Sequence, residues 1–139
     1  MKLSLGSQLN NYGSDSTCWS FSKDDQVPFP IIQGIIANTK TNNTLTIELK
    51  VDTGFNGVLG LAESAIKELQ LTAGGHSMVR SATGEKRLEY YEVNLSIPKT
   101  PFWNMKAIAF KTPRPIIGRM LLNFGSWLYD GKNNNWCLL

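Results

Sequence analysis

The chain has 139 residues, which is enough for one compact domain with a hydrophobic core. Hydrophobic residues make up 42% and charged residues 18%, a balance typical of globular rather than disordered proteins. The net charge of +3 comes from basic residues scattered along the chain, and no apolar run approaches the roughly 18 residues that span a bilayer. These features argue against a phosphate-binding stripe and against a membrane protein.

Residues 1–26 are polar and rich in turn formers, and we expect an N-terminal extension there, ahead of a single domain at residues 27–139. Within the extension, residues 17–22 alternate as a short strand does. The start of the chain lacks the long apolar run of a signal peptide, so we expect a cytoplasmic protein.

The two cysteines, Cys18 and Cys137, lie near opposite ends of the chain. In a reducing compartment two free thiols are expected, with a disulfide as the alternative. They are not spaced as metal ligands, and the one histidine, His76, cannot complete a site with them. We expect no metal and no cofactor, and we place His76 in a surface loop.

The first half of the domain predicts a β-hairpin. Residues 29–37 are rich in β-branched side chains and lead into a turn cluster. Residues 44–51 then alternate, and their apolar side chains share one face: Leu45, Ile47, Leu49 and Val51. The second strand of this hairpin delivers Asp52 at its end.

A short apolar strand is expected at residues 57–61, followed by a helix at residues 62–70. The apolar side chains of the helix are spaced by three and four: Ala62, Ala65, Ile66 and Leu69. Residues 76–97 form two extended arms around a polar tip, where Thr83-Gly84 predicts the turn of a long hairpin.

The last third continues the β pattern, with a strand expected at residues 105–110. A short helix is expected at residues 118–124, closed by Gly125. Two strands joined by a turn are expected at residues 126–130 and 135–139. Many short strands with few helices predict an all-β barrel or sandwich.

Two motifs point to chemistry. Asp52-Thr53-Gly54 follows an apolar strand and precedes another apolar strand and a helix, and Ile116-Ile117-Gly118-Arg119 comes later in the chain. By itself, Asp-Thr-Gly is compatible with an ordinary turn. The order of the first motif, the long hairpin and the second motif resembles the retropepsin-like aspartic proteases, the one-lobe relatives of retroviral proteases. The resemblance covers about Phe29 to Leu139.

The resemblance implies an all-β fold, a closed or partly open β-barrel of the acid-protease type with one or two short helices, a flap hairpin and a homodimeric state. It assigns catalysis to Asp52, Thr53 and Gly54. The residues it implies for substrate binding are Phe55, Asn56, Ala82, Thr83, Gly84 and Ile117. Those it implies for structural support of the site are Ile116, Gly118 and Arg119.

The implied activity is hydrolysis of peptide bonds by an activated water. This reaction needs one group that accepts a proton and one that donates a proton, and two carboxylates that share a proton supply both. The chain has one Asp-Thr-Gly, so the second carboxylate must be Asp52 of a second copy. The expected partners are a peptide or protein substrate and this second copy, with neither nucleic acid nor membrane. Residues 135–139 are expected to add a strand across the two-fold axis.

Three residues depart from the family pattern. Met120 follows Arg119 where Asp or Asn is common, and Asn56 replaces the acid that pairs with this arginine in retroviral members. We therefore expect Arg119 to bond a backbone carbonyl or Asn56. Phe55 replaces a small residue, and it either fills a substrate subsite or packs.

Two other functions compete with the protease. A non-proteolytic peptide-binding or assembly module on the same fold would not need an intact Asp-Thr-Gly. A small barrel that binds nucleic acid would need a basic, aromatic face, which the sequence pattern does not favour. The tryptophans at positions 103, 127 and 136 are expected in a core or an interface.

Overall fold

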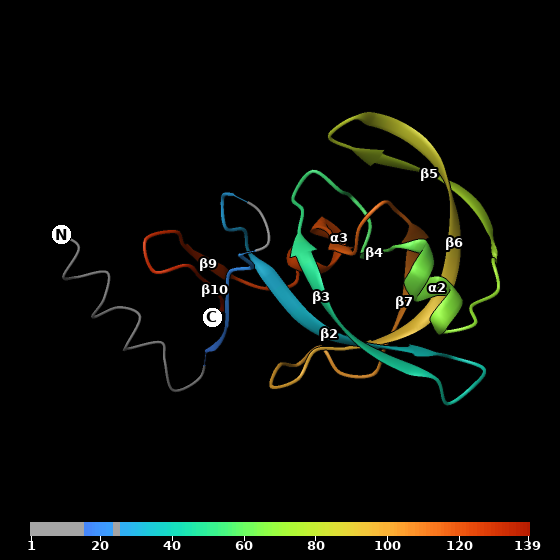
Figure 1. Cartoon of the computed structure of the whole chain (residues 1–139), viewed down its shortest axis with the longest axis horizontal. Helices are drawn as coiled ribbons and strands as arrows, with labels where there is room; N and C mark the ends of the chain where they lie inside the picture. Colours follow the sequence, from blue (N-terminus) through green and yellow to red (C-terminus); the bar gives the residue numbers. More distant parts are fainter. Residues whose placement is uncertain (1–15, 24–25) are drawn as a thin grey trace.

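The computed structural model describes residues 16–23 and 26–139 (Figure 1). The strands of this part of the chain are β1 (Thr17–Ser20), β2 (Ile31–Asn38), β3 (Thr44–Val51), β4 (Leu59–Leu61), β5 (Gly75–Ser81), β6 (Gly84–Ser96), β7 (Met105–Lys111), β8 (Ile116–Ile117), β9 (Trp127–Asp130) and β10 (Asn135–Leu138). The helices are α2 (Glu63–Glu68) and α3 (Arg119–Leu122). Neither helix is long and apolar enough to cross a membrane.

Six of the strands form a closed barrel. Their order is β2-β3-β8-β4-β7-β6, and β6 pairs with β2 to close the circle. Among the described residues the strand β5 pairs only with β6, so the β5–β6 hairpin extends from the barrel and arches over one end of it (Figure 1). The expectation of an all-β barrel with two short helices is confirmed.

The alternating pattern of β3 explains its place in the barrel wall. Its apolar residues are buried or half-buried and its polar residues from Thr44 to Glu48 are exposed, as the period of two requires. The strand begins and ends where the sequence predicts, and it pairs with β2 from Ile31↔Lys50 to Ala37↔Thr44. The helix α2 buries Ala65 and Ile66 against the barrel, which matches its predicted face.

Several elements differ from the expectation, among them β8 and α3. The strand β8 was not predicted, because two residues carry no periodicity that a sequence pattern can reveal. It pairs in parallel with β3 and antiparallel with β4. The helix α3 ends at Leu122 with its C-cap at Asn123, so it is shorter than the segment predicted to run up to Gly125.

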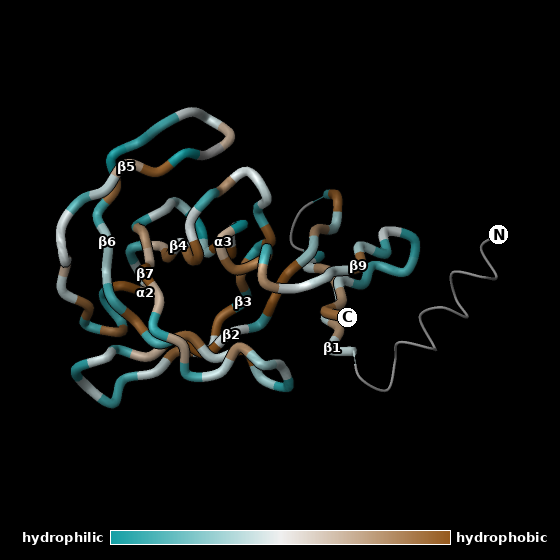
Figure 2. The backbone as a smooth tube through the Cα atoms, turned by 180° about the vertical axis from the view of Figure 1, so that it is seen from behind, coloured by the Kyte–Doolittle hydropathy of each residue, from teal (hydrophilic) through white to brown (hydrophobic). Residues whose placement is uncertain are grey.

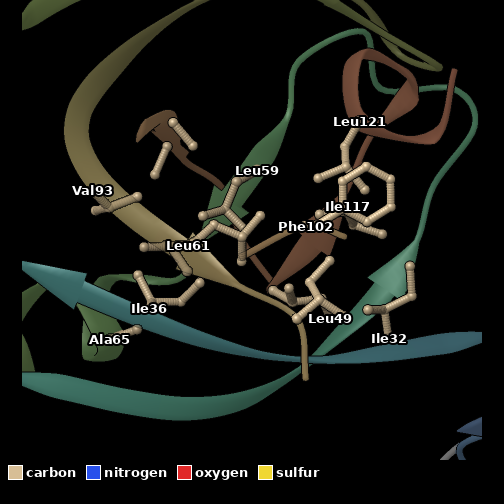
Figure 3. Close-up of a cluster of buried hydrophobic side chains, with 14 of the residues drawn as sticks. Ile32, Ile36, Leu49, Leu59, Leu61, Ala65, Val93, Phe102, Ile117 and Leu121 are labelled. Carbon is tan, nitrogen blue, oxygen red and sulfur yellow. The ribbon is translucent and has the colours of Figure 1, made fainter. Parts of the chain in front are cut away.

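The hydrophobic core fills the barrel. Figure 3 shows apolar side chains from opposite walls pointing toward one another, among them Ile36, Leu49 and Leu61, all fully buried. Phe102 and Leu121 cover one end of this cluster, and Ala65 joins it from α2. In Figure 2 the loops that project from the barrel are mostly hydrophilic. Burial of each Leu or Ile side chain contributes about 2 kcal/mol, so this interior holds the walls in one arrangement.

A second, three-stranded sheet lies beside the barrel, in the order β1-β10-β9 (Figure 1). Its aromatic side chains pack against the barrel end, where the Trp127 ring stacks on Trp136 at 5.4 Å and on Phe102 at 6.4 Å. Trp103, by contrast, is 58% exposed. Because β10 pairs with β1 on one side and β9 on the other, it has no free edge. The expectation that residues 135–139 add a strand to a second copy is therefore wrong.

Cys18 and Cys137 form a disulfide between β1 and β10, where the two residues face each other in register. The expectation of two free thiols is therefore wrong. Two cysteines at opposite ends of the chain meet because the first described strand pairs with the last one. Disulfides are rare in the reducing cytosol, so the bond argues against the cytoplasmic location expected from the sequence.

Candidate active site

Asp52 lies where β3 leaves the barrel wall. Its backbone N–H donates to the carbonyl of Ile117 at 2.9 Å, which continues the pairing of β3 with β8 by one residue. The chain then turns, and the N–H of Phe55 donates to the Asp52 carbonyl at 3.2 Å. The carboxylate accepts a hydrogen bond from the N–H of Gly54 at 2.9 Å and stays half-buried. The loop thus holds one oxygen of the carboxylate through its own backbone.

Gly54 lies between the carboxylate and the tip of the β5–β6 hairpin. A β-carbon added at Gly54 would lie 3.2 Å from Asp52 Oδ1 and 3.3 Å from the β-carbon of Ala82. Both contacts are tighter than ordinary van der Waals packing, so the hairpin tip can rest on the loop because residue 54 has no side chain. Thr53, between Asp52 and Gly54, is exposed.

Gly118 packs beneath the same loop. Its N–H donates to the carbonyl of Val58 at 2.9 Å, and a β-carbon at Gly118 would collide with the carbonyl oxygens of Gly57 and Phe55. The next N–H, that of Arg119, donates to the Phe55 carbonyl at 2.9 Å. The second motif therefore supports the first through backbone contacts that leave no space for a side chain at position 118.

The two isoleucines of the second motif face different surroundings. Ile117, predicted to contact substrate, is fully buried in the barrel core opposite Val51 and Leu59. Ile116, predicted to support the site, lines the groove beside Asp52. Successive residues of a strand point to opposite faces, so only one of the two can reach the groove.

The β5–β6 hairpin covers the site with a two-residue turn. Ser81 pairs with Gly84, so the turn residues are Ala82 and Thr83 rather than the predicted Thr83 and Gly84. Gly84 begins β6 with a φ of +106°, a conformation that favours glycine. Ala82 and Thr83 line the groove with Asp52, whereas Gly84 does not.

Asn56 joins the loop to the hairpin. Its N–H donates to the carbonyl of Arg80 at 3.2 Å, and its side-chain Oδ1 accepts from the N–H of Arg80 at 3.1 Å. The expected bond between Asn56 and Arg119 is not found among the described residues. The Asn56 side chain is instead bonded to the β5 backbone, and Arg119 remains exposed beside it.

We predict that Asn56→Ala loosens the hairpin, because the N–H of Arg80 loses its acceptor. A hydrogen bond of this kind contributes about 1 kcal/mol, so hydrogen exchange at Arg80 should become about fivefold faster. The matched control is Asn56→Asp, which keeps the acceptor oxygen and should exchange like the wild type. Unchanged exchange in Asn56→Ala would show that this bond does not hold the hairpin in solution.

A groove of about 600 Å³ runs between the loop and the hairpin. Its apolar part is a small cluster separate from the barrel core, formed by Phe55, Val79 and Ile116 with Leu88 and Phe110 packed against them. Phe55 is 1% exposed and its ring meets Phe110 edge to face at 6.2 Å. Phe55 therefore packs as the groove floor, while Val79 and Leu88 form the inner face of the hairpin.

Basic side chains surround the groove. They come from three separate stretches of the chain and are Lys50, Lys86, and the pair Lys111 and Arg114. The Lys50 ammonium lies 4.5 Å from the centre of the Phe29 ring, and the Arg114 guanidinium lies 5.9 Å from the same centre. Cation–π contacts of this kind hold a cation against a ring without neutralising it. Asp52 is the one carboxylate among the described residues that line the groove.

Acidic groups lie next to Lys111. Its ammonium is 3.7 Å from a carboxylate oxygen of Glu63. The hydroxyl of Tyr91 donates to Glu89 at 2.5 Å, and this bond, with the nearby charges of Lys111 and His76, lowers the pKa of Glu89. Burial, with the same bond, raises the pKa of Tyr91 to about 12. His76 lies on β5 rather than in the predicted loop, 4.0 Å from Glu89.

The structure thus brings together Asp52, Thr53, Phe55 and the hairpin tip, and separates Ile117 from them. The sequence patterns missed Val79, Leu88 and the basic side chains. Alternation along the two hairpin arms would have placed Val79 and Leu88 on an inner face, whereas no local signal identifies the basic residues. No three His, Cys, Asp or Glu side chains gather as a metal site in the described part of the chain. The chain matches no known family model, and no curated protein matches it.

Proposed function

We propose that the protein is a homodimeric aspartic endopeptidase. The observation that carries the proposal is Asp52 itself. It is half-buried at the end of a strand, it is held by the Gly54 N–H, and it lines a groove under a hairpin. An aspartate that served only to form a turn would not need to face a 600 Å³ groove with an apolar floor.

The chemistry needs a second carboxylate. Hydrolysis of a peptide bond requires a base for the water and an acid for the substrate carbonyl or leaving amine. No other Asp or Glu lines the groove among the described residues. Two copies of Asp52 about 3 Å apart would share one proton, because two like charges that close cannot both ionise readily. The protonated member would then act as acid and the ionised member as base.

The exposed Thr53 and the hairpin tip are the surfaces we assign to the second copy. Thr53 directly follows Asp52 and is exposed, so its hydroxyl group would be available to contact the second copy. In this arrangement the hairpin acts as a flap, which excludes water from the groove when substrate is bound. The contacts of Ala82 with Gly54 and of Asn56 with Arg80 would hold this flap near the carboxylate.

Activity should depend on dimerisation, because each chain supplies one carboxylate. We predict that specific activity falls as the protein is diluted and that the fall coincides with dissociation in sedimentation measurements. Adding the inactive Asp52→Asn protein to wild type should reduce activity further, since mixed dimers hold one carboxylate and one amide. A monodisperse monomer that still cleaves an unfolded protein would contradict the shared site.

The pH profile should be bell-shaped with its maximum below neutrality. Activity requires one proton on the carboxylate pair, so it rises as the first proton leaves and falls as the second one leaves. Compounds with a hydroxyl in place of the scissile amide should inhibit, because that hydroxyl takes the place of the water. Activity that stays constant above neutrality, or that a chelator abolishes, would require another mechanism.

The alternative is a peptide-binding or assembly module without proteolysis. The apolar floor and the overlying hairpin are compatible with it, and a monomer with a single carboxylate would bind a peptide without cleaving it. The dilution experiment separates the two functions. Binding without cleavage at every protein concentration supports the module.

A further inference from the structure

The lining of the groove around Asp52 carries mostly positive charge. Among the described residues, four basic side chains and one carboxylate, that of Asp52, line the groove. We infer that it accepts an extended polypeptide with acidic side chains flanking the bond to be cleaved. This inference rests on the proposed function, to which it adds a substrate class.

Lys50 is placed to contact a substrate side chain about two residues from the scissile bond. It lies two residues before Asp52 on β3, and residues two apart on a strand point to the same face. It is opposite Ile116, the isoleucine that lines the groove. A strand rises about 3.3 Å per residue, so Lys50 lies roughly 7 Å along the floor from Asp52. An extended substrate would bring its second residue from the scissile bond to that place.

Phe29 and Arg114 strengthen this basic end. The Phe29 ring holds Lys50 at 4.5 Å and Arg114 at 5.9 Å, so both cations lie against one ring. The ring itself is positioned by two backbone hydrogen bonds with Ser22, at 2.9 and 3.2 Å. A substrate carboxylate placed there would meet two cations with restricted motion, which reduces the entropy cost of the ion pair.

Lys86 supplies a cation from the roof of the groove. It is opposite Val79 in the β5–β6 register, and opposite residues of an antiparallel pair share a face. Val79 is buried against Phe55, so the shared face is the inner one. The outer face of the hairpin instead carries the Arg80–Glu85 pair, with a distance of 2.9 Å. Neither Lys50 nor Lys86 has an acidic partner among the described residues.

Lys111 contributes less to this bias because Glu63 lies 3.7 Å from its ammonium group. The preference should therefore depend mainly on Lys50 and Lys86. Acidic side chains next to the scissile bond itself should be disfavoured, because they would approach the carboxylate pair. The expected substrate combines apolar residues at the bond, over the floor of Phe55 and Ile116, with Asp or Glu about two residues away.

The first experiment is digestion of a mixed peptide library, with cleaved bonds identified by mass spectrometry. Asp and Glu should be enriched about two residues from the bond. Two peptides are then compared that differ only by Glu or Gln at that position. We expect the Glu peptide to be cleaved with about fivefold higher kcat/KM at low salt, and the difference should shrink at 0.5 M salt.

Charge variants test the assigned residues. Lys50→Gln and Lys86→Gln should each reduce the Glu-over-Gln ratio, with cleavage of the Gln peptide as the reference for each variant. The control is Lys132→Gln, at an exposed position in the turn between β9 and β10, which should keep the wild-type ratio. Equal cleavage of the Glu and Gln peptides by the wild type would overturn the inference and leave the protease intact.

Binding to the Asp52→Asn protein separates this inference from the proposed function. Fluorescence anisotropy of the labelled Glu and Gln peptides needs no cleavage. Tighter binding of the Glu peptide that weakens in Lys50→Gln supports the acidic preference even if no peptide is cleaved. Failure of the Glu peptide to bind more tightly overturns it, as would a single-stranded oligonucleotide that binds through the same lysines and displaces the Glu peptide.

Discussion

We expect Asp52→Asn to abolish the proposed peptidase activity and to leave the fold in place. Asparagine keeps the oxygen that accepts the Gly54 N–H, so the loop should retain its conformation. It cannot share a proton as a carboxylate does, and a dimer of this variant has neither the base nor the acid. General acid–base catalysis by one group contributes about 10²- to 10⁴-fold, so the loss of both groups should reduce kcat at least about a thousandfold.

The measurement is cleavage of an unfolded protein at mildly acidic pH, with circular dichroism and thermal unfolding to verify the fold. The matched control is Glu48→Gln, an exposed carboxylate on the same strand, which should retain full activity. If Asp52→Asn cleaves as fast as the wild type, the activity does not come from this site. If Glu48→Gln loses as much activity, the loss in Asp52→Asn reflects a change in charge or stability and not the loss of the carboxylate pair.

The barrel could be predicted because most of its strands carry their own pattern. The alternation from Leu45 to Val51 defines β3 without knowledge of its neighbours, and the burial of its alternate residues follows from it. The first motif of the site could also be recognised in the sequence, since Asp52, Thr53 and Gly54 are consecutive. Its position at a strand end followed from the pattern of β3 alone.

Long-range pairing explains what the sequence patterns missed. The strand β8 has two residues, and only its pairing with β3 and β4 decides that Ile116 faces the groove and Ile117 the core. Cys18 and Cys137 face each other only after β1 pairs with β10. The basic residues that line the groove come from three stretches that lie far apart in the sequence, so no short part of the chain reveals that they come together.

Reduction of the Cys18–Cys137 disulfide should destabilise the protein strongly. The bond joins residues 119 positions apart, and closing a loop of that length restricts the unfolded chain. The chain-entropy model gives about 5 kcal/mol for such a loop. For a chain of this size, about 3 °C per kcal/mol corresponds to a melting temperature roughly 15 °C lower. Thermal unfolding of the wild type with and without reductant measures the difference without changing any other side chain.

The control is Cys18→Ser, which has no disulfide and should melt near the reduced wild type, with or without reductant. Equal melting temperatures for oxidised and reduced wild type would show that the bond does not form in solution.

Reduction of the disulfide should affect catalytic activity less than it affects stability. Asp52 is held by Ile117 and Gly54, and neither contact passes through β1. Well below its melting temperature, the reduced protein should therefore keep its kcat. Any loss should appear as a higher KM for acidic peptides. Ser22 follows β1 closely in the chain and pairs with Phe29, and the Phe29 ring in turn contacts Lys50.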